Sequence, residues 1–305
     1  MNKKSGLTLT VVFKAQSLNY GEGIGNISEL KKLNRGNGKT YTFASRQALR
    51  YDIVRLGQKL YNWNLQTVDK EKGTVQFEDK YSIADSEEMD IFGYMKTKKG
   101  KGTEEAGGSD IRSAVARLSN AISLEVYKSD MDFLTNKGLA DRINEHPNLA
   151  NIEQHLSFYA YTVTLDLSNL GVDDSTVLDN NVRAKRAIEL LEIIKILNRE
   201  IRGREENLSP LFVIGGIYDI NSPFFLGRIR LTGSEKGFYL DTQILKDTIQ
   251  LKIGDREIKE DTSIGMVSHT FANEEEINQI AEVPVIGVQE FFDKIEQQVR
   301  EYYAE

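Results

Sequence analysis

The sequence predicts an α+β fold built as one decorated domain, and three observations lead to that prediction. Strand-like alternation and helix-like apolar periodicity both recur along the chain, and they follow one another in mixed order. With 305 residues, of which 40% are hydrophobic and 28% charged, the chain can bury a sizeable core. The sequence has no internal repeat and no obvious linker, so we expect a single domain over residues 1–305.

The first elements expected are a strand, a glycine-rich loop and a helix. Residues 7–15 alternate apolar and polar side chains, which predicts a strand with one buried and one water-exposed face. The loop "SLNYGEGIGN" (17–26) follows it. Ser45 is a plausible N-cap for a helix over 46–61, because an apolar stripe follows at helical spacing. That stripe consists of Leu49, Ile53, Leu56 and Leu60.

The rest of the chain continues the mixture of strands and helices. Residues 94–108 are rich in lysine and glycine without apolar periodicity, which predicts a mobile loop. We expect strands at 73–79, 155–167 and 264–270, two more within 210–231, and helices at 110–124, 180–202 and 241–250 and near the end, to 303. This order is compatible with a split βαβ core of the RRM-like (ferredoxin-like) kind that carries insertions.

Charge is unevenly distributed along the chain. The net charge is −7, yet residues 30–60 carry a net +7 and residues 235–305 a net −9. A polyanion responds to a local basic face more than to the total, so nucleic-acid binding remains open, as does a solvated basic helix balanced by an acidic tail. Cysteine is absent, no apolar run could span a membrane, and "MNKKSG" does not resemble a secretory signal. We expect a cytoplasmic protein.

None of the familiar motifs for nucleotide binding or catalysis is complete. The glycine-rich loop has Asn26 where a dinucleotide fingerprint needs its third glycine, and "RGNGKT" (35–40) has Leu33 where a P-loop needs its first. "KGFYL" (236–240) has Tyr239 where an RNA-recognition motif has Gly or Ala. The three histidines lack metal-ligand spacing, and no catalytic signature is present. We therefore expect no enzyme activity, no cofactor and no metal.

One long stretch carries a more specific signal. Residues 7–53 contain "SLNYGEGIGN", "ELKKL" and "SRQALR", and "SDIRSAVARLSNAISLE" and "SPLFVIGGIYDINSPFFLGRIRL" lie downstream. These stretches resemble the CRISPR-associated DevR-like (Cas-seven) RAMP family, the backbone subunits of type I-B Cascade complexes. The resemblance runs over most of the chain, and the last 60 residues or so are the least specific.

The resemblance implies an RRM-like palm with a finger-like insertion at about 64–155 and a thumb-like β-hairpin at about 213–228. It also implies a non-catalytic guide (CRISPR) RNA-binding subunit of antiviral defence, whose copies multimerise along the spacer and support pairing with target DNA. Its partners would be the guide RNA, target DNA through the RNA–DNA hybrid, further copies and other Cascade subunits, without a membrane. Two alternatives remain: a RAMP-type endoribonuclease acting on CRISPR or target RNA, and a free-standing nucleic-acid-binding or regulatory protein.

Three segments hold most of the candidate RNA-binding side chains. The start of the helix at 46–61 offers guanidinium groups, which suit phosphate, although either arginine could instead pair with an acidic neighbour. The lysine loop could close over nucleic acid as a finger or remain solvated. The hairpin at 213–228 could wedge phenylalanines beside a base or be core. The candidates are Lys14, Asn19, Tyr20, Asn26, Lys31, Lys32, Ser45, Arg46, Gln47, Arg50, Lys96, Lys98, Lys99, Lys101, Arg112, Asn221, Phe224, Phe225, Arg228 and Arg230.

Overall fold

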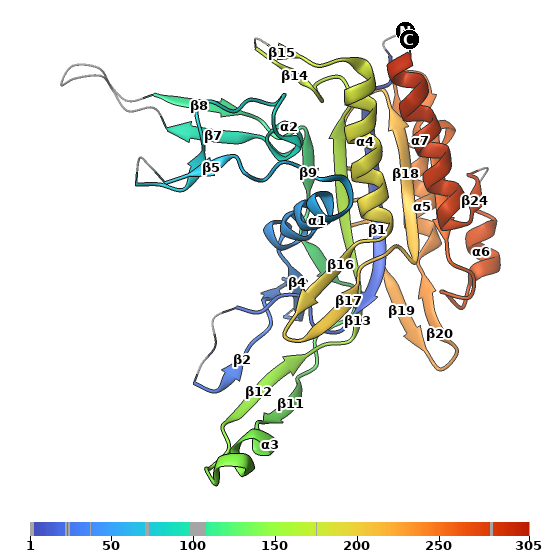
Figure 1. The fold of residues 1–305 in the computed structure, drawn as a ribbon. Coiled ribbons are helices and arrows are strands. Elements are labelled where there is room, and N and C mark those ends of the chain that lie inside the picture. Colours follow the sequence, from blue (N-terminus) through green and yellow to red (C-terminus); the bar gives the residue numbers. More distant parts are fainter. Residues whose placement is uncertain are drawn as a thin grey trace.

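A mixed, mostly antiparallel sheet forms the centre of the computed structural model (Figure 1). The structure describes the whole chain except residues 1–2, 22, 24, 37, 71–72, 98–107, 175, 281–282 and 305. The strands lie in the order β24-β23-β18-β1-β13-β10-β4-β3, and β9 also pairs with β13. Their bounds are β1 Gly6–Ala15, β3 Lys32–Asn34, β4 Thr40–Ala44, β9 Ala116–Leu118, β10 Ala121–Ser123, β13 Ser157–Asp166, β18 Phe212–Tyr218, β23 Thr262–Met266 and β24 Val285–Ile286.

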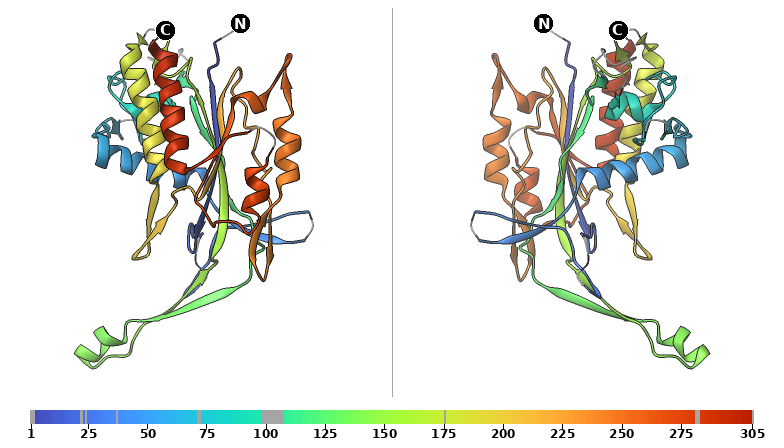
Figure 2. Two further views of the ribbon diagram at one scale, coloured as in Figure 1. Left: turned by 90° about the vertical axis from the view of Figure 1, so that its right-hand side faces the viewer. Right: turned by 90° about the vertical axis from the view of Figure 1, so that its left-hand side faces the viewer.

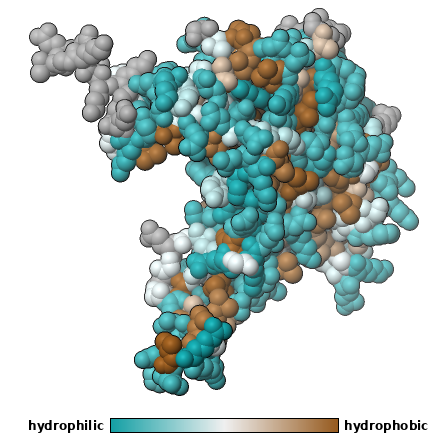
Figure 3. All heavy atoms as spheres, in the orientation of Figure 1, coloured by the Kyte–Doolittle hydropathy of each residue, from teal (hydrophilic) through white to brown (hydrophobic). Residues whose placement is uncertain are grey.

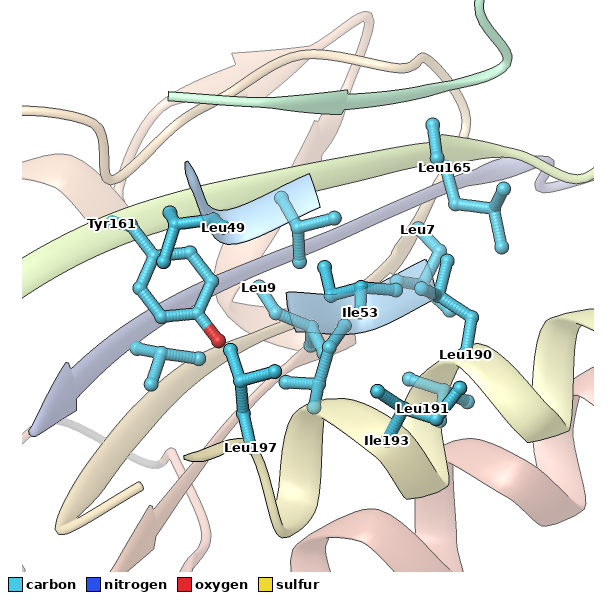
Figure 4. Close-up of a cluster of buried hydrophobic side chains, with 14 of the residues drawn as sticks. Leu7, Leu9, Leu49, Ile53, Tyr161, Leu165, Leu190, Leu191, Ile193 and Leu197 are labelled. Atoms are coloured by element: carbon cyan, nitrogen blue, oxygen red, sulfur yellow. The ribbon is translucent and has the colours of Figure 1, made fainter. Parts of the chain in front are cut away.

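Three helices cover one face of this sheet. They are α1 Arg46–Tyr61, α4 Asn180–Lys195 and α7 Val288–Ala304. The apolar positions of β1 that alternate along the strand, among them Leu7 and Leu9, point into a core that α1 and α4 complete (Figure 4). Apolar residues on both sides of this interface remove their surface from water, which is the main force that fixes the helices on the sheet.

The other face of the sheet is also covered, so the prediction of a water-exposed face on β1 was wrong. Every residue of β1 except Lys14 is buried. The Thr10 and Thr162 hydroxyls lie 2.7 Å apart, and the Thr8 hydroxyl donates to the Ser222 carbonyl at 2.8 Å. A second apolar cluster forms under the C-terminal third of the chain, because the later segments fold back over this face (Figure 2). These segments are β19 Leu231–Ser234, β20 Gly237–Leu240, α5 Thr242–Ile249, β21 Lys252–Ile253, β22 Arg256–Glu257, a 3-10 helix at Ile258–Asp261 and α6 Glu274–Asn278.

Two projections extend from the sheet on the same side, and the surface between them is hollowed (Figures 1 and 3). We call the upper one the finger module; it contains β5 Val68–Asp69, β6 Gln76–Phe77, α2 Glu87–Phe92, β7 Tyr94–Thr97 and β8 Ser109–Arg112. We call the lower one the arm; it contains β11 Asp130–Thr135, α3 Lys137–Ala140, a 3-10 helix at Asp141–Ile143 and β12 Leu149–Gln154, with β2 Ile27–Ser28 alongside. α1 lies between the two projections (Figure 1).

Two short hairpins complete the described elements. They are β14 Val172–Asp173 with β15 Thr176–Val177, and β16 Asn198–Ile201 with β17 Arg204–Asn207. Arg202 and Gly203 both have positive φ, 48° and 75°, which is the backbone of a two-residue hairpin turn. The helix expected over 180–202 therefore ends early, at Lys195, and residues 198–201 form the first strand of this hairpin instead.

The helix over 46–61 and the helix near 241–250 are confirmed, and β13 confirms the strand expected at 155–167. The helix expected at 110–124 was wrong, because that stretch forms β8, β9 and β10. Strands β9 and β10 pair with strands distant in sequence, and β8 pairs with β7. This pairing outweighs the local helical spacing.

Within the described ranges, no helix is both long and apolar enough to cross a membrane.

The second strand expected within 210–231 is also absent, so the hairpin at 213–228 does not form. β18 is a central strand buried on both faces, and residues 219–230 continue as turns. Gly216 lies where neighbouring backbone approaches closely, since a Cβ there would come 1.8 Å from the Asp261 carbonyl oxygen. The glycines of this strand therefore serve close packing in the sheet and do not loosen a hairpin.

Candidate nucleic-acid interface

The start of α1 is fixed by side chains from two separate loops. The Ser45 hydroxyl accepts a hydrogen bond from the Ala48 N–H at 3.3 Å and caps the helix. The Ser45 N–H donates to the side-chain oxygen of Asn19 at 3.1 Å, and the Arg46 N–H donates to that of Asn120 at 3.0 Å. The first turn holds no acidic residue, so the positive end of the helix dipole has no carboxylate of its own.

A pocket of about 340 Å³ opens beside this helix start. Three of its lining residues are the sequence candidates Arg46, Gln47 and Arg50, which the helix brings together on neighbouring turns. The others are Phe92, Ala114, Ala116, Arg117 and Leu118. Arg50 donates to Glu88 at 2.8 Å and lies 5.1 Å from the centre of the Phe92 ring, so it is already held by the finger module.

A second pocket, of about 730 Å³, adjoins the first along residues 111–117. The two pockets share Ala114 and Arg117, and together they form one groove, which we call the α1 groove. The second pocket is the more acidic part of the groove, because Asp166, Asp173 and Asp174 line it. Burial, and then the charge of Asp173, raise the pKa of the Tyr94 phenol to about 12. The basic end of the α1 groove is therefore the end beside the helix start.

Arg117 is the residue of this groove that sequence reasoning missed. It is exposed on β9, and its Nε donates to the Ala114 carbonyl at 3.4 Å. Neither Arg117 nor Arg46 forms an ion pair with a carboxylate of the described residues. The helix expected over 110–124 did not include Arg117 in its apolar stripe, whereas the alternation of Ala116, Arg117 and Leu118 fits a short strand with one polar side.

The candidates of the N-terminal loop hold the base of the arm. The Tyr20 hydroxyl donates to the Glu153 carbonyl at 3.0 Å, and Lys32 pairs with the Glu153 carboxylate at 2.9 Å. Burial opposes ionisation of Glu153, but the hydrogen bonds from Lys32 and the Leu30 N–H outweigh it, so the pKa of Glu153 is lowered. Asn26 is exposed and accepts the Asn151 N–H at 2.9 Å through its carbonyl, and Lys31 is half-buried.

The described lysine and arginine candidates of the finger module are held by partners within the protein, although Arg112 also lines the second pocket. Lys96 is buried and donates to the Tyr81 carbonyl. Arg112 pairs with the fully buried Asp90 at 2.7 Å, and Arg186 of α4 pairs with the same carboxylate at 2.7 Å. This network fastens the module to α4. The other three loop lysines, Lys98, Lys99 and Lys101, lie outside the described residues.

The remaining candidates lie on the face of the sheet away from α1 or beyond β18. Lys14 is exposed and lies 5.5 Å from the centre of the Phe158 ring. Phe224 is half-buried against Tyr218, with 4.8 Å between ring centres, while Phe225 is fully buried and presents no face to a ligand. Three further candidates are exposed: Asn221, which lines the second pocket, Arg228 and Arg230.

Comparisons with known proteins add the family. The sequence model of the family described as "CRISPR-associated negative auto-regulator DevR/Csa2" matches residues 7–230, and no curated protein gives a significant match. Among solved structures, a chain of a "CRISPR RNA-guided surveillance complex" is similar in fold, with a TM-score of 0.57 and 14% identity over 98% of this chain and 99% of that one. A chain of a "CRISPR RNA-guided surveillance complex, pre-nicking" is similar with a TM-score of 0.58 and 12% identity over 97% and 100%. Because the family match spans most of its length, the chain belongs to the CRISPR-associated DevR/Csa2 family.

Proposed function

We propose that this chain is a non-catalytic subunit that binds a CRISPR guide RNA through the α1 groove. The observation that carries the proposal is the pair Arg46 and Arg117, two arginines without carboxylate partners at a helix start that has no acid in its first turn. Guanidinium groups and the positive end of a helix dipole both favour phosphate. Membership of the family and the similarity in fold to chains of RNA-guided surveillance complexes also support a guide RNA as the ligand.

The sheet supports an RRM-like palm. Its central order β18-β1-β13-β9, with α1 following β1 and α4 following β13, is the strand order of a split βαβ core. The insertion at about 64–155 then supplies both the finger module and the arm within one decorated domain. We assign the thumb-like role to the arm, because it is a long projecting hairpin and residues 213–228 are not.

Exposed apolar side chains on both projections suit contacts between copies. On the arm, Phe133 is 56% exposed and Ile143 70% exposed. On the finger module, Met95 and Ile111 are cross-strand neighbours, and both are exposed. A contact between different surfaces of successive copies repeats along a line, as binding along a guide RNA requires. We infer a homo-multimer within a type I-B Cascade complex, where further subunits and target DNA, paired to the RNA, complete the assembly.

The phosphate contact is tested by the salt dependence of binding. Replacing Arg46 and Arg117 together by alanine should weaken binding to all RNA sequences alike and lower the slope of log K against log salt by about one or two units. Arg300→Ala on α7, away from the α1 groove, is the matched control and should keep the wild-type slope. An unchanged slope in the double variant would refute phosphate contact at this groove.

The absence of catalysis is tested separately. Labelled guide RNA and target RNA are incubated with the purified protein, with and without magnesium, and we expect both to stay intact. Site-specific cleavage would favour the RAMP-type endoribonuclease instead.

Sizing with guide RNAs of increasing length tests multimerisation. A backbone subunit should form multimers that grow with the RNA, whereas a free-standing regulatory protein should not.

A further inference from the structure

Tyr51 is an aromatic side chain on α1 that the groove described above does not include. It is 65% exposed, and the described residues give it no hydrogen bond, ion pair or ring contact. A single exposed tyrosine is common on protein surfaces and carries no meaning alone. Tyr51 is of functional interest because of its position relative to the α1 groove.

Tyr51 lies beside the basic end of the groove. Gln47 precedes it by one helical turn, so the two side chains are neighbours on the helix surface, and Arg50 is the adjacent residue. Gln47 and Arg50 line the pocket that Arg46 and Arg117 also line. Arg46 and Tyr51 are separated by about 7.5 Å of helical rise, which different parts of one bound strand can span. The helix lies between the finger module and the arm (Figure 1).

We propose that Tyr51 stacks on a base of the single-stranded nucleic acid whose phosphates occupy the α1 groove. This inference rests on the proposed function and extends it, because it adds a contact to a base where the arginines contact only the backbone. Every base has a flat π-face, so a stacking contact holds a base without selecting its identity. Such a contact is therefore compatible with a subunit that accepts any guide sequence.

Alanine and phenylalanine at position 51 separate stacking from other roles. Tyr51→Ala should weaken binding of a labelled oligouridine about 5- to 150-fold, whereas Tyr51→Phe, which keeps the ring, should bind as the wild type does. No charge is removed, so the salt slope should stay at its wild-type value, unlike that of the double arginine variant. With an abasic oligomer of the same length, the difference between wild type and Tyr51→Ala should disappear.

A tryptophan at the same position reports stacking directly. The sequence has one tryptophan, Trp63, which is buried and donates to Glu189 at 2.8 Å, so it gives a background that ligand does not reach. Emission from Tyr51→Trp should be quenched when oligouridine binds. Leu60→Trp is the matched control, because Leu60 is 42% exposed on the same helix about 13 Å further along. Its emission should not change.

The outcomes distinguish this inference from the proposed function. Suppose that the wild type binds RNA with an arginine-dependent salt slope. Stacking by Tyr51 is then refuted if Tyr51→Ala binds equally well, or if Leu60→Trp is quenched as strongly as Tyr51→Trp. In either case, phosphate binding at the α1 groove remains supported. If Tyr51→Ala changes only the size of the RNA-bound multimer, Tyr51 contacts a neighbouring protein copy and the inference is likewise refuted. If the wild type does not bind RNA, both proposals fail.

Discussion

Glu192 on α4 and Glu296 on α7 share a hydrogen bond between their side chains where these helices pack. Lys195 pairs with Glu192 at 2.6 Å but lies 3.9 Å from Glu296. Burial, and then the neighbouring Glu192, raise the pKa of Glu296 from its ordinary 4.5 to about 7. Burial also opposes ionisation of Glu192, but its contacts with Glu296 and Lys195 outweigh this and lower its pKa. Glu296 is thus the member of the pair that holds the proton.

The raised pKa has a definite sign for stability. Because the folded state binds a proton at Glu296 more tightly than the unfolded state, the free energy of unfolding falls as pH rises from about 4.5 to about 7 and then levels off. At 1.36 kcal/mol for each pKa unit, the full penalty is roughly 3 kcal/mol, and the lowered pKa of Glu192 offsets part of it. We expect Glu296→Gln, which stays neutral and can still donate to Glu192, to be more stable than the wild type by about 1–3 kcal/mol near pH 8 and equal to it below about pH 4.

Urea denaturation followed by circular dichroism across this pH range measures the difference. Glu301→Gln is the control, because Glu301 is an exposed carboxylate on the same helix. Its unfolding free energy should follow that of the wild type at every pH. If the curves for Glu296→Gln and the wild type run parallel between about pH 5 and pH 8, Glu296 does not hold a proton in the folded state and the reasoning is refuted.

Three further perturbations test other parts of the structure. Tyr161→Phe should raise the free energy of unfolding by about 1 kcal/mol, because the Tyr161 hydroxyl is fully buried without a hydrogen-bond partner in the described residues; a loss of stability would contradict this. Asp90→Asn should cost about 3–5 kcal/mol and expose the finger module to limited proteolysis, since it leaves two buried arginines without their carboxylate, and wild-type protease resistance would argue against that role. Phe133→Ser combined with Ile143→Ser should leave the isolated chain folded but shrink the RNA-bound multimers seen by sizing, and unchanged multimers would exclude the arm from the contact between copies.

The parts of the fold predicted from sequence are those that local signals determine. α1 begins and ends as expected, because Ser45 caps it and an apolar stripe follows at helical spacing. The same local pattern placed Arg46, Gln47 and Arg50 together at one pocket. For these residues, a helix and its cap are sufficient to fix the geometry.

The parts that sequence reasoning missed depend on contacts between distant segments. Residues 110–124 have helical spacing, yet they pair as strands with partners that lie elsewhere in the chain. Arg117 joined the groove only through that pairing, and β1 lost its water-exposed face only because the C-terminal third folds over it. The alternation at residues 116–118 is too short to outweigh the helical spacing around it, and nothing within β1 indicates which distant segments cover its second face.

The position of β1 at the centre of the sheet also constrains how the chain acquires its fold. β1 is the first strand, yet its two neighbours are β13 and β18, so Leu9 lies opposite Val163 on one side and Gly215 on the other. A ribosome that adds roughly 5–20 residues each second needs on the order of 10–40 s to supply the intervening 200 or so residues. β13 emerges first, so one edge of β1 stays unpaired until β18 follows, and an unpaired strand edge promotes aggregation. We therefore expect folding to be slow and to depend on chaperones during synthesis, because the central hydrogen bonds close only after about two thirds of the chain has emerged.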